Sequence, residues 1–206
     1  VLRFYTNFVI DPSSKTWDLS LPSSTQMFIE GRLAFYLAPS WRAHELRQAN
    51  PSLKFKTVAV PQLPGGAKVA WATFWAEGVS AKSTHSEEAW KFVKFLTAAD
   101  TLKQMYSQQS QTRLFGEPYS RIDISQELLG DPWVGSVITQ APYYKGWYLN
   151  SRTFDAGLND EMIKYYEDAI NATVQGTNPA EALEITASGV QQVLDKYTKG
   201  APDINK

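Results

Sequence analysis

Aromatic rings are the side chains of this sequence with the greatest capacity to bind a ligand. The 206 residues include 7 Trp, 10 Tyr and 10 Phe, whereas only His44 and His85 carry imidazoles and Cys is absent. Without thiols there are no disulfides, cysteine nucleophiles or zinc–thiolate sites, and two histidines leave little material for a metal site or a proton relay. No GxxxxGK[ST], GxGxxG or HExxH motif is present. The sequence therefore predicts no metal and no cofactor.

Composition narrows the class of protein further. The 20 Lys and Arg residues are balanced by 21 Asp and Glu residues, so the formal net charge is -1. This balance removes the long-range positive field with which nucleic-acid binders collect their partner, and we expect no nucleic-acid partner. The hydrophobic fraction of 43% is typical of a globular protein, and no apolar run approaches the roughly 20 residues of a membrane span.

Residue periodicity and caps predict helices that would carry most of the fold. In the first half, helices are expected over 24–30, 41–48, 84–96 and 101–109, the third opened by a Thr84–Glu87 capping box. In the second half, Asn159 is expected to cap a helix that ends before Gly176, and Asn178 is expected to cap the last helix, to about residue 197. Side chains at helical spacing are expected in the core: Trp90, Phe92, Phe95 and Tyr166. His44 and His85 are expected at the surface or as caps.

The segments between these helices are expected to be strands or loops. Short apolar runs ended by proline predict buried strands over 33–38 and 55–60, and residues 69–80 are expected to be extended. Residues 112–151 are rich in Pro, Gly and aromatic residues without a sustained period, which predicts loops and short helical turns.

Three stretches carry a family resemblance in their order and spacing. Residues 28–41 place a helix end, Gly31, a short apolar run and Trp41 in succession, and residues 77–96 contain the pattern S-x-x-x-E-x-A-W-x-F-x-x-F-L. Residues 168–183 resemble a closing pair of helices. Together they resemble the extracellular solute-binding proteins of bacterial ABC sugar importers, the carbohydrate-binding family that includes maltose-binding protein.

The resemblance implies an α/β fold and a division between two lobes. The chain is similar to the C-terminal portion of a two-lobed periplasmic-binding-protein-like fold and is helix-rich in this segment. By resemblance, residues 1–70 belong to the second lobe, 71–140 to the inter-lobe crossing and the first lobe, and 141–206 to the closing helices of the second lobe. A chain without the N-terminal half is expected to expose apolar surface, and therefore to dimerise, to swap elements or to be one piece of a longer chain.

The resemblance also implies a non-enzymatic function. Such a protein binds a carbohydrate, either an oligosaccharide or a related polyol, in the cleft between its lobes. It then delivers the ligand to the membrane permease of an ABC importer. A periplasmic location, or that of an extracellular lipoprotein, is expected.

Six residues are candidates for contact with such a ligand. A sugar packs its C–H face on an aromatic plane and needs hydrogen bonds at its hydroxyl rim, which a guanidinium can supply. By resemblance the candidates are Trp41, Trp71, Trp75, Trp147, Tyr148 and Arg152. Trp75 matches the Trp of a G-G-W segment in the family, although Thr73 and Phe74 stand where the two glycines would be.

Two other classes of function stay open on the residues alone. A glycosidase would need two paired carboxylates, for which Glu117, Asp123 and Asp155 are available, although nothing in the sequence pairs them. Alternatively, the aromatic surplus would form a surface that meets a partner protein.

Overall fold

Helices make up 53% of the described structure. The computed structural model describes residues 1–146 and 157–199. By their internal contacts the residues fall into two units, one formed by Val1–Leu21 with Trp147–Lys206 and the other by Pro22–Gly146. The prediction of a helix-rich segment is confirmed, whereas the assignment of residues to two lobes stays a prediction.

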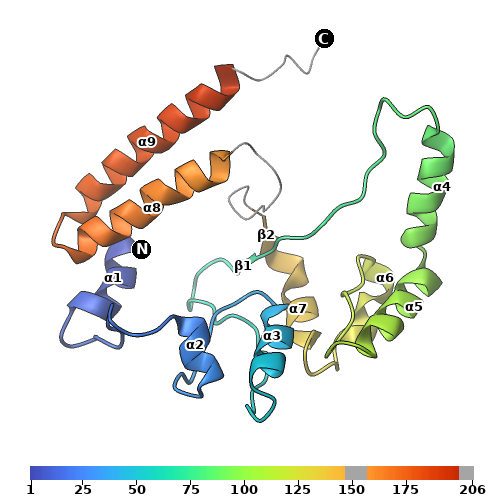
Figure 1. Ribbon diagram of the computed structural model, residues 1–206, viewed down its shortest axis with the longest axis horizontal. Helices are drawn as coiled ribbons and strands as arrows, with labels where there is room; N and C mark the ends of the chain where they lie inside the picture. The colour runs from blue at the N-terminus through green and yellow to red at the C-terminus, as the bar shows by residue number, and fades with distance from the viewer. Residues whose placement is uncertain (147–156, 200–206) are drawn as a thin grey trace. The chain divides into compact units, whose positions relative to one another are not determined.

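The first unit contains three described helices, and the second contains the remaining elements (Figure 1). The helices of the first unit are α1 (Leu2–Ile10), α8 (Leu158–Val174) and α9 (Pro179–Lys199). The longer elements of the second unit are α2 (Ser24–Ile29), α3 (Arg42–Ala49), α4 (Ser86–Leu96) and α5 (Ala99–Ser110). Its shorter elements are β1 (Ala70–Trp71), α6 (Ile122–Ser125), η1 (Gln126–Leu128), α7 (Gly135–Gln140), η2 (Ala141–Tyr143) and β2 (Tyr144–Lys145).

The turn between α8 and α9 shows why this helix pair forms. Gly176 follows the C-cap residue with φ 105°, a left-handed conformation that glycine adopts without steric penalty. The amide of Thr177 donates to Ala172 O at 2.9 Å and that of Gly176 to Thr173 O at 3.1 Å, the two bonds of a Schellman motif. Asn178 Oδ1 then accepts from the Ala180 amide at 2.9 Å. The predicted stop at Gly176 and the predicted cap at Asn178 are confirmed.

Helices α8 and α9 pack on each other, and each has buried residues. Met162 is fully buried on α8, and Ala182 and Val193 are buried on α9. Thr186 Oγ1 donates to Tyr165 O across the pair at 3.2 Å, and α1 packs on α8. The prediction that Asn159 caps α8 is wrong, because Gly157 is the N-cap residue and Asn159 is buried inside the first turn.

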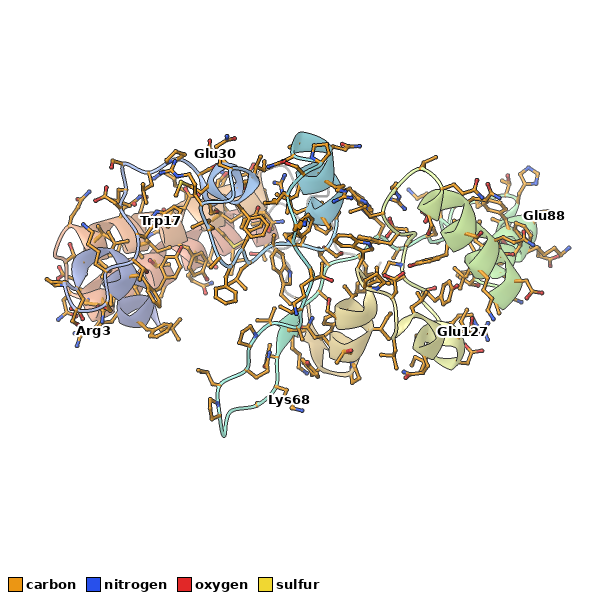
Figure 2. All side chains as sticks on the ribbon, turned by 90° about the horizontal axis from the view of Figure 1, so that it is seen from below. Arg3, Trp17, Glu30, Lys68, Glu88 and Glu127 are labelled. Carbon is orange, nitrogen blue, oxygen red and sulfur yellow. The ribbon has the colours of Figure 1, made fainter. Side chains whose placement is uncertain are left out.

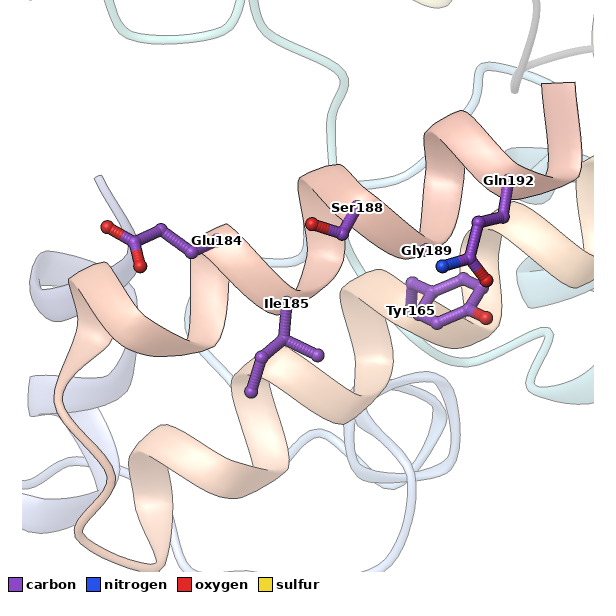
Figure 3. A pocket seen from close by; sticks show the side chains of 6 residues that line it. All are labelled: Tyr165, Glu184, Ile185, Ser188, Gly189 and Gln192. Atoms are coloured by element: carbon purple, nitrogen blue, oxygen red, sulfur yellow. The ribbon is translucent and has the colours of Figure 1, made fainter. Parts of the chain in front are cut away.

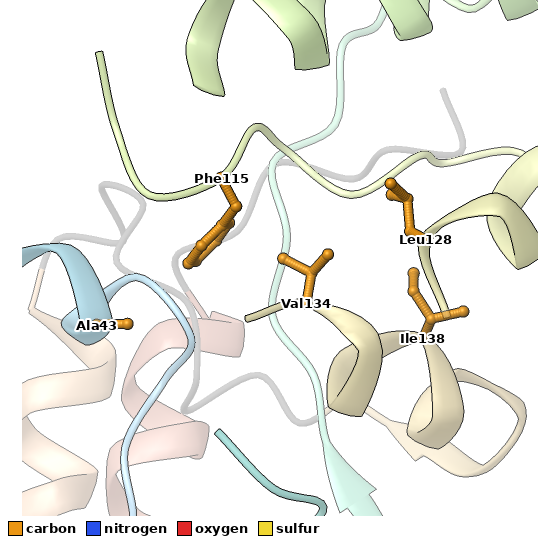
Figure 4. Close-up of a cluster of buried hydrophobic side chains, with 5 residues drawn as sticks. All are labelled: Ala43, Phe115, Leu128, Val134 and Ile138. Carbon is orange, nitrogen blue, oxygen red and sulfur yellow. The ribbon is translucent and has the colours of Figure 1, made fainter. Parts of the chain in front are cut away.

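A hydrophobic cluster holds the second unit together (Figure 4). Its buried members are Ala43, Phe115, Leu128, Val134 and Ile138. They come from α3, η1, α7 and the connections between them, so the segment predicted as loops and short turns supplies most of this core. Two backbone approaches leave no room for a Cβ atom. A Cβ at Gly116 would lie 2.5 Å from Tyr106 Cα, and one at Gly135 would lie 2.4 Å from Leu129 O.

The predicted buried strands over 33–38 and 55–60 are not found. The described strand pairing consists of β1 and β2 alone, in parallel register. Residues 33–38 make no backbone–backbone hydrogen bond within the described part of the chain, and Phe35 and Leu37 are 86% and 78% exposed. Residues 53–60 do alternate between half-buried and exposed positions, as a strand would. The strand pattern is therefore present, but the described residues offer it no partner strand.

Helix α4 also differs from its prediction. A helix does form there, as do those predicted at α2, α3 and α5, but the N-cap residue is His85 and no side chain caps it, so the Thr84 capping box is wrong. The helix buries no residue, and Trp90, Phe92 and Phe95 are 50%, 61% and 59% exposed. Their prediction as core is therefore wrong. The apolar stripe is real, but the described neighbours of α4 do not cover it.

Candidate ligand-binding site

Trp41 stands at the start of α3, on a helix whose other face is anchored. Ala43 and Leu46 are buried, whereas the Trp41 side chain is 47% exposed. Trp41 is the N-cap residue, and its indole makes no capping bond to the helix. Arg42 next to it pairs with Glu45, and this carboxylate raises the pKa of the Arg42 guanidinium. Packing thus anchors the helix that begins after Trp41, while the indole itself is half open to solvent.

Trp71 is held outward by the parallel pair of β1 and β2. Ala70 pairs with Tyr144 and Trp71 with Lys145, and successive strand residues point to opposite faces. Ala70 is accordingly 5% exposed and Trp71 57%. On the partner strand the Tyr144 hydroxyl donates to Val137 O at 2.9 Å, and burial raises the pKa of that phenol. The buried side therefore fastens the pair to α7 and leaves the Trp71 indole free to meet a ligand.

Trp75 lies beyond β1 on a stretch without helix or strand. Phe74 and Trp75 are 81% and 82% exposed, and residues 72–80 belong to no regular element. Before β1, the connection through residues 61–69 projects as a loop that carries Lys68 (Figure 2). Packing therefore positions Trp75 much less firmly than Trp41 or Trp71.

The described structure does not join the six candidates into one site. Ring contacts within residues 1–146 and 157–199 link none of Trp41, Trp71 and Trp75 to one another. The other three candidates, Trp147, Tyr148 and Arg152, lie outside the described residues. Three further apolar side chains near these indoles along the chain are exposed, which the sequence did not indicate: Phe35, Leu37 and Phe74. An apolar run reads as core whether or not a partner strand is present, so no local signal would have revealed their exposure.

The two described candidate carboxylates for hydrolysis, Asp123 and Glu117, are engaged in ion pairs. Arg121 binds Asp123 through two hydrogen bonds of 2.9 and 2.7 Å and holds the pKa of that carboxyl below its usual range. Glu117 pairs with Arg113 at 3.1 Å, and Asp155 lies outside the described residues. A glycosidase acid needs a raised pKa, so the environment of Asp123 is the opposite of that requirement.

Two shallow depressions lie elsewhere, one in each unit. The first, of about 350 Å³, lies along α8 and α9 and is lined by Tyr165, Glu184, Ile185, Ser188, Gly189 and Gln192 (Figure 3). The second, of about 430 Å³, lies along α4 and α5 and includes Phe95 and Met105. Neither contains a predicted ligand-binding residue.

Residues 1–146 and 157–199 contain no group of three or more His, Asp or Glu side chains placed to hold a metal ion. Nor does any helix in them have the length and apolar character needed to cross a bilayer.

Comparison with known protein families shows which family the chain belongs to. Residues 1–112 match the family described as bacterial extracellular solute-binding protein, and this stretch is more than half of the 206 residues. The chain belongs to this family. Trp41, Trp71 and Trp75 lie inside the matched stretch, as do two of the three sequence motifs that first indicated the resemblance.

Membership of the solute-binding proteins carries general properties. The family is generally non-enzymatic, and it implies ligand binding and interaction with the permease of an ABC transporter. It also indicates a periplasmic or extracellular location.

Proposed function

We propose that this solute-binding protein captures a carbohydrate, either an oligosaccharide or a related polyol, in a cleft between two lobes and delivers it to an ABC permease. The observation that carries the proposal is the pair of outward-facing indoles at Trp41 and Trp71, each fixed by a buried neighbour on its own element. Ala43 fixes the first and Ala70 the second. An aromatic plane that solvent can reach, on a backbone that packing holds still, suits the C–H face of a sugar ring.

The energy required is within reach of such a site. Micromolar binding needs about -8 kcal/mol. Each aromatic platform buries roughly 150–250 Å² and adds on the order of 1 kcal/mol beyond its buried area. Two or three platforms with several hydrogen bonds supply this total for an uncharged ligand. Arg152 is proposed to donate hydrogen bonds to adjacent hydroxyls.

Binding without hydrolysis agrees better with the environment of the described candidate carboxylates than catalysis does. Asp123 is held by an arginine that favours its ionised form, which suits a structural ion pair rather than a catalytic acid. Delivery to the permease requires only that the lobes close on the ligand. Attachment to the membrane as a lipoprotein is part of the same proposal.

A ligand screen with a parallel turnover assay tests the proposal. Thermal unfolding would be recorded with maltose, maltotriose, cellobiose, xylobiose, galactobiose, sorbitol and mannitol, and reducing-end release would be measured with the five oligosaccharides. We expect at least one ligand to raise the unfolding temperature and none to be hydrolysed. Hydrolysis of any sugar would contradict the proposal that the protein only binds its ligand. If no ligand raised the unfolding temperature, the proposal that the ligand is a carbohydrate would be contradicted.

The exposed apolar face of α4 favours a second role, in protein association. Trp90, Phe92 and Phe95 occupy one helix that buries none of its residues, and such apolar surface is typical of an interface. Self-association is therefore proposed as an additional property; a dimer is one of the alternatives left open by the sequence. Sedimentation equilibrium tests it: a monomeric mass across all concentrations would contradict the role.

A further inference from the structure

His44 connects α3 to a segment about seventy residues later in the chain. Its Nδ1 atom accepts a hydrogen bond from the Leu114 amide at 3.3 Å. Its ring lies 4.2 Å from the Phe115 ring, centroid to centroid, at an interplanar angle of 32°. Because Nδ1 is the acceptor, the single proton of the neutral ring is on Nε2. The contact therefore depends on the protonation state of the imidazole.

The segment that His44 holds is wedged between α3 and α5. Phe115 is buried in the hydrophobic cluster beside Ala43, and Gly116 lies so close to Tyr106 of α5 that no Cβ fits between them. The Glu117 amide donates to Gln109 Oε1 at 2.7 Å. The α5 side of the segment is thus held by backbone packing and a non-titrating amide, whereas the α3 side is held by the titrating imidazole.

We propose that His44 is a pH-sensitive latch that fastens residues 113–117 to α3 when neutral and releases them when protonated. Protonation places a second N–H on the ring, directed at the Leu114 N–H, so an accepted hydrogen bond becomes a contact between two donors. The positive charge also enters a half-buried position, where it loses hydration. Both effects weaken the contact of residues 113–117 with α3 and leave their contact with α5 unchanged.

The charges around His44 agree with release in mild acid. Burial is the main cause that lowers the pKa of His44 below 6.5, and the Arg113 guanidinium lowers it further. Glu117 and Glu45 act in the opposite direction, but Arg113 and Arg42 respectively pair with them. Since the folded state disfavours the charged ring, the latch is closed above about pH 6.5 and opens as the pH falls through the lowered pKa.

The consequence for ligand binding rests on the proposed function. Trp41 precedes His44 by one helical turn, and its carbonyl accepts a hydrogen bond from the His44 amide at 3.1 Å. Release of the wedge removes the contact that holds α3 one helical turn from this indole. If Trp41 contacts ligand as proposed, affinity is lower in mild acid than at neutral pH.

The latch can be tested without a ligand. Because the protein has only two histidines, their imidazole NMR signals are easily told apart. Imidazole and amide NMR signals would be followed from about pH 8 to about pH 5. We expect His44 to titrate below the usual range of a histidine, and the Leu114 amide to shift with the midpoint of His44. After correction for intrinsic exchange, protection of the Leu114 amide should fall by about tenfold over this range. A Leu114 amide whose signal and protection do not follow His44 would overturn the proposal.

Two matched variants separate the latch from general acid sensitivity. His44→Asn keeps an acceptor oxygen near the position of Nδ1 but cannot titrate, so protection of Leu114 should become independent of pH. His85→Asn changes an exposed histidine at the start of α4 and should leave the wild-type pH response intact. A pH response that survives in His44→Asn would contradict the latch, and the wild-type titration decides the question if that variant does not fold.

Affinity measurements then distinguish failure of the latch from failure of the proposed function. With a sugar found in the screen, the dissociation constant should rise several-fold from about pH 7.5 to about pH 5 in the wild type and stay level in His44→Asn. If NMR shows the latch but affinity does not change, the link to Trp41 is wrong while the latch stands.

Discussion

The α8–α9 hairpin and helix α4 carry equally clear amphipathic patterns, yet only the hairpin buries its apolar stripe. Met162, Ala182 and Val193 are buried on the two helices, whereas Phe92 and Phe95 of α4 are more than half exposed. The difference lies in whether the element that covers the apolar stripe is close by in the sequence. The partner of α8 follows it in sequence after a four-residue connection, and the described chain supplies no corresponding partner for α4. An amphipathic stripe therefore predicts that a surface will be covered but not what covers it.

The largest expected effect contrasts a buried side chain of the hairpin with an exposed one of α4. Met162→Ala removes a fully buried side chain and should lower the free energy of unfolding by about 2–5 kcal/mol. Phe92→Ala should lower it by less than about 1 kcal/mol, because that ring is 61% exposed. Urea denaturation followed by circular dichroism measures both. Equal losses would mean that α4 is covered in solution.

A smaller effect tests the close backbone approach in the second unit. Gly116→Ala places a methyl group against the backbone of Tyr106 and should destabilise the protein by about 1–3 kcal/mol. Gly130→Ala is the matched control, since a Cβ there meets nothing within 4 Å. Thermal unfolding compares them, and a neutral Gly116→Ala variant would argue against the wedge between α3 and α5.

The caps of the two regions should differ by about 1 kcal/mol. Asn178→Ala removes an oxygen that accepts from the Ala180 amide and should reduce stability by about 0.5–2 kcal/mol. Thr84→Ala should have almost no effect, because α4 begins at Ser86 without a side-chain cap. If urea denaturation showed a comparable loss of stability in Thr84→Ala, Thr84 would cap α4 in solution after all.

The smallest expected effect is a difference in acid sensitivity. The His44 contact contributes stability above about pH 6.5 that is lost as the pH falls through its lowered pKa. In the hairpin, Lys196 lowers the pKa of Glu161 below 4.5, so that contribution is lost only below this value. Hydrogen exchange by mass spectrometry at several pH values should show residues 112–119 losing protection before residues 158–174. The reverse order would contradict both assignments.

Local signals were sufficient for most helices and for their stops. The Schellman turn at Gly176 and the cap at Asn178 depend on neighbouring residues only, so the sequence alone could predict them. The strands expected at 33–38 and 55–60 are not found among the described residues, because a ladder needs a second strand and a local pattern does not show whether one is present. The alternation at residues 53–60 was a correct signal for extended backbone and an incomplete one for a sheet.

The candidate site was predictable to a similar extent. Residue type and the family turn indicated Trp41, and the structure gives it a half-exposed position on an anchored helix. Its role in ligand binding stays a prediction, as do those of the other five candidates. The interaction of His44 with Leu114 could not be foreseen, since it joins residues far apart in sequence through the core.

Isothermal titration of one sugar from the screen into Trp41→Ala, Trp90→Ala and the wild-type protein tests the central claim most directly. Both indoles are about half exposed, at 47% and 50%, but only Trp41 is proposed to contact ligand. We predict that Trp41→Ala weakens binding by roughly 10- to 100-fold, as loss of one aromatic platform should, while Trp90→Ala leaves the affinity unchanged. Unchanged affinity in Trp41→Ala, or equal losses in the two variants, would contradict the account.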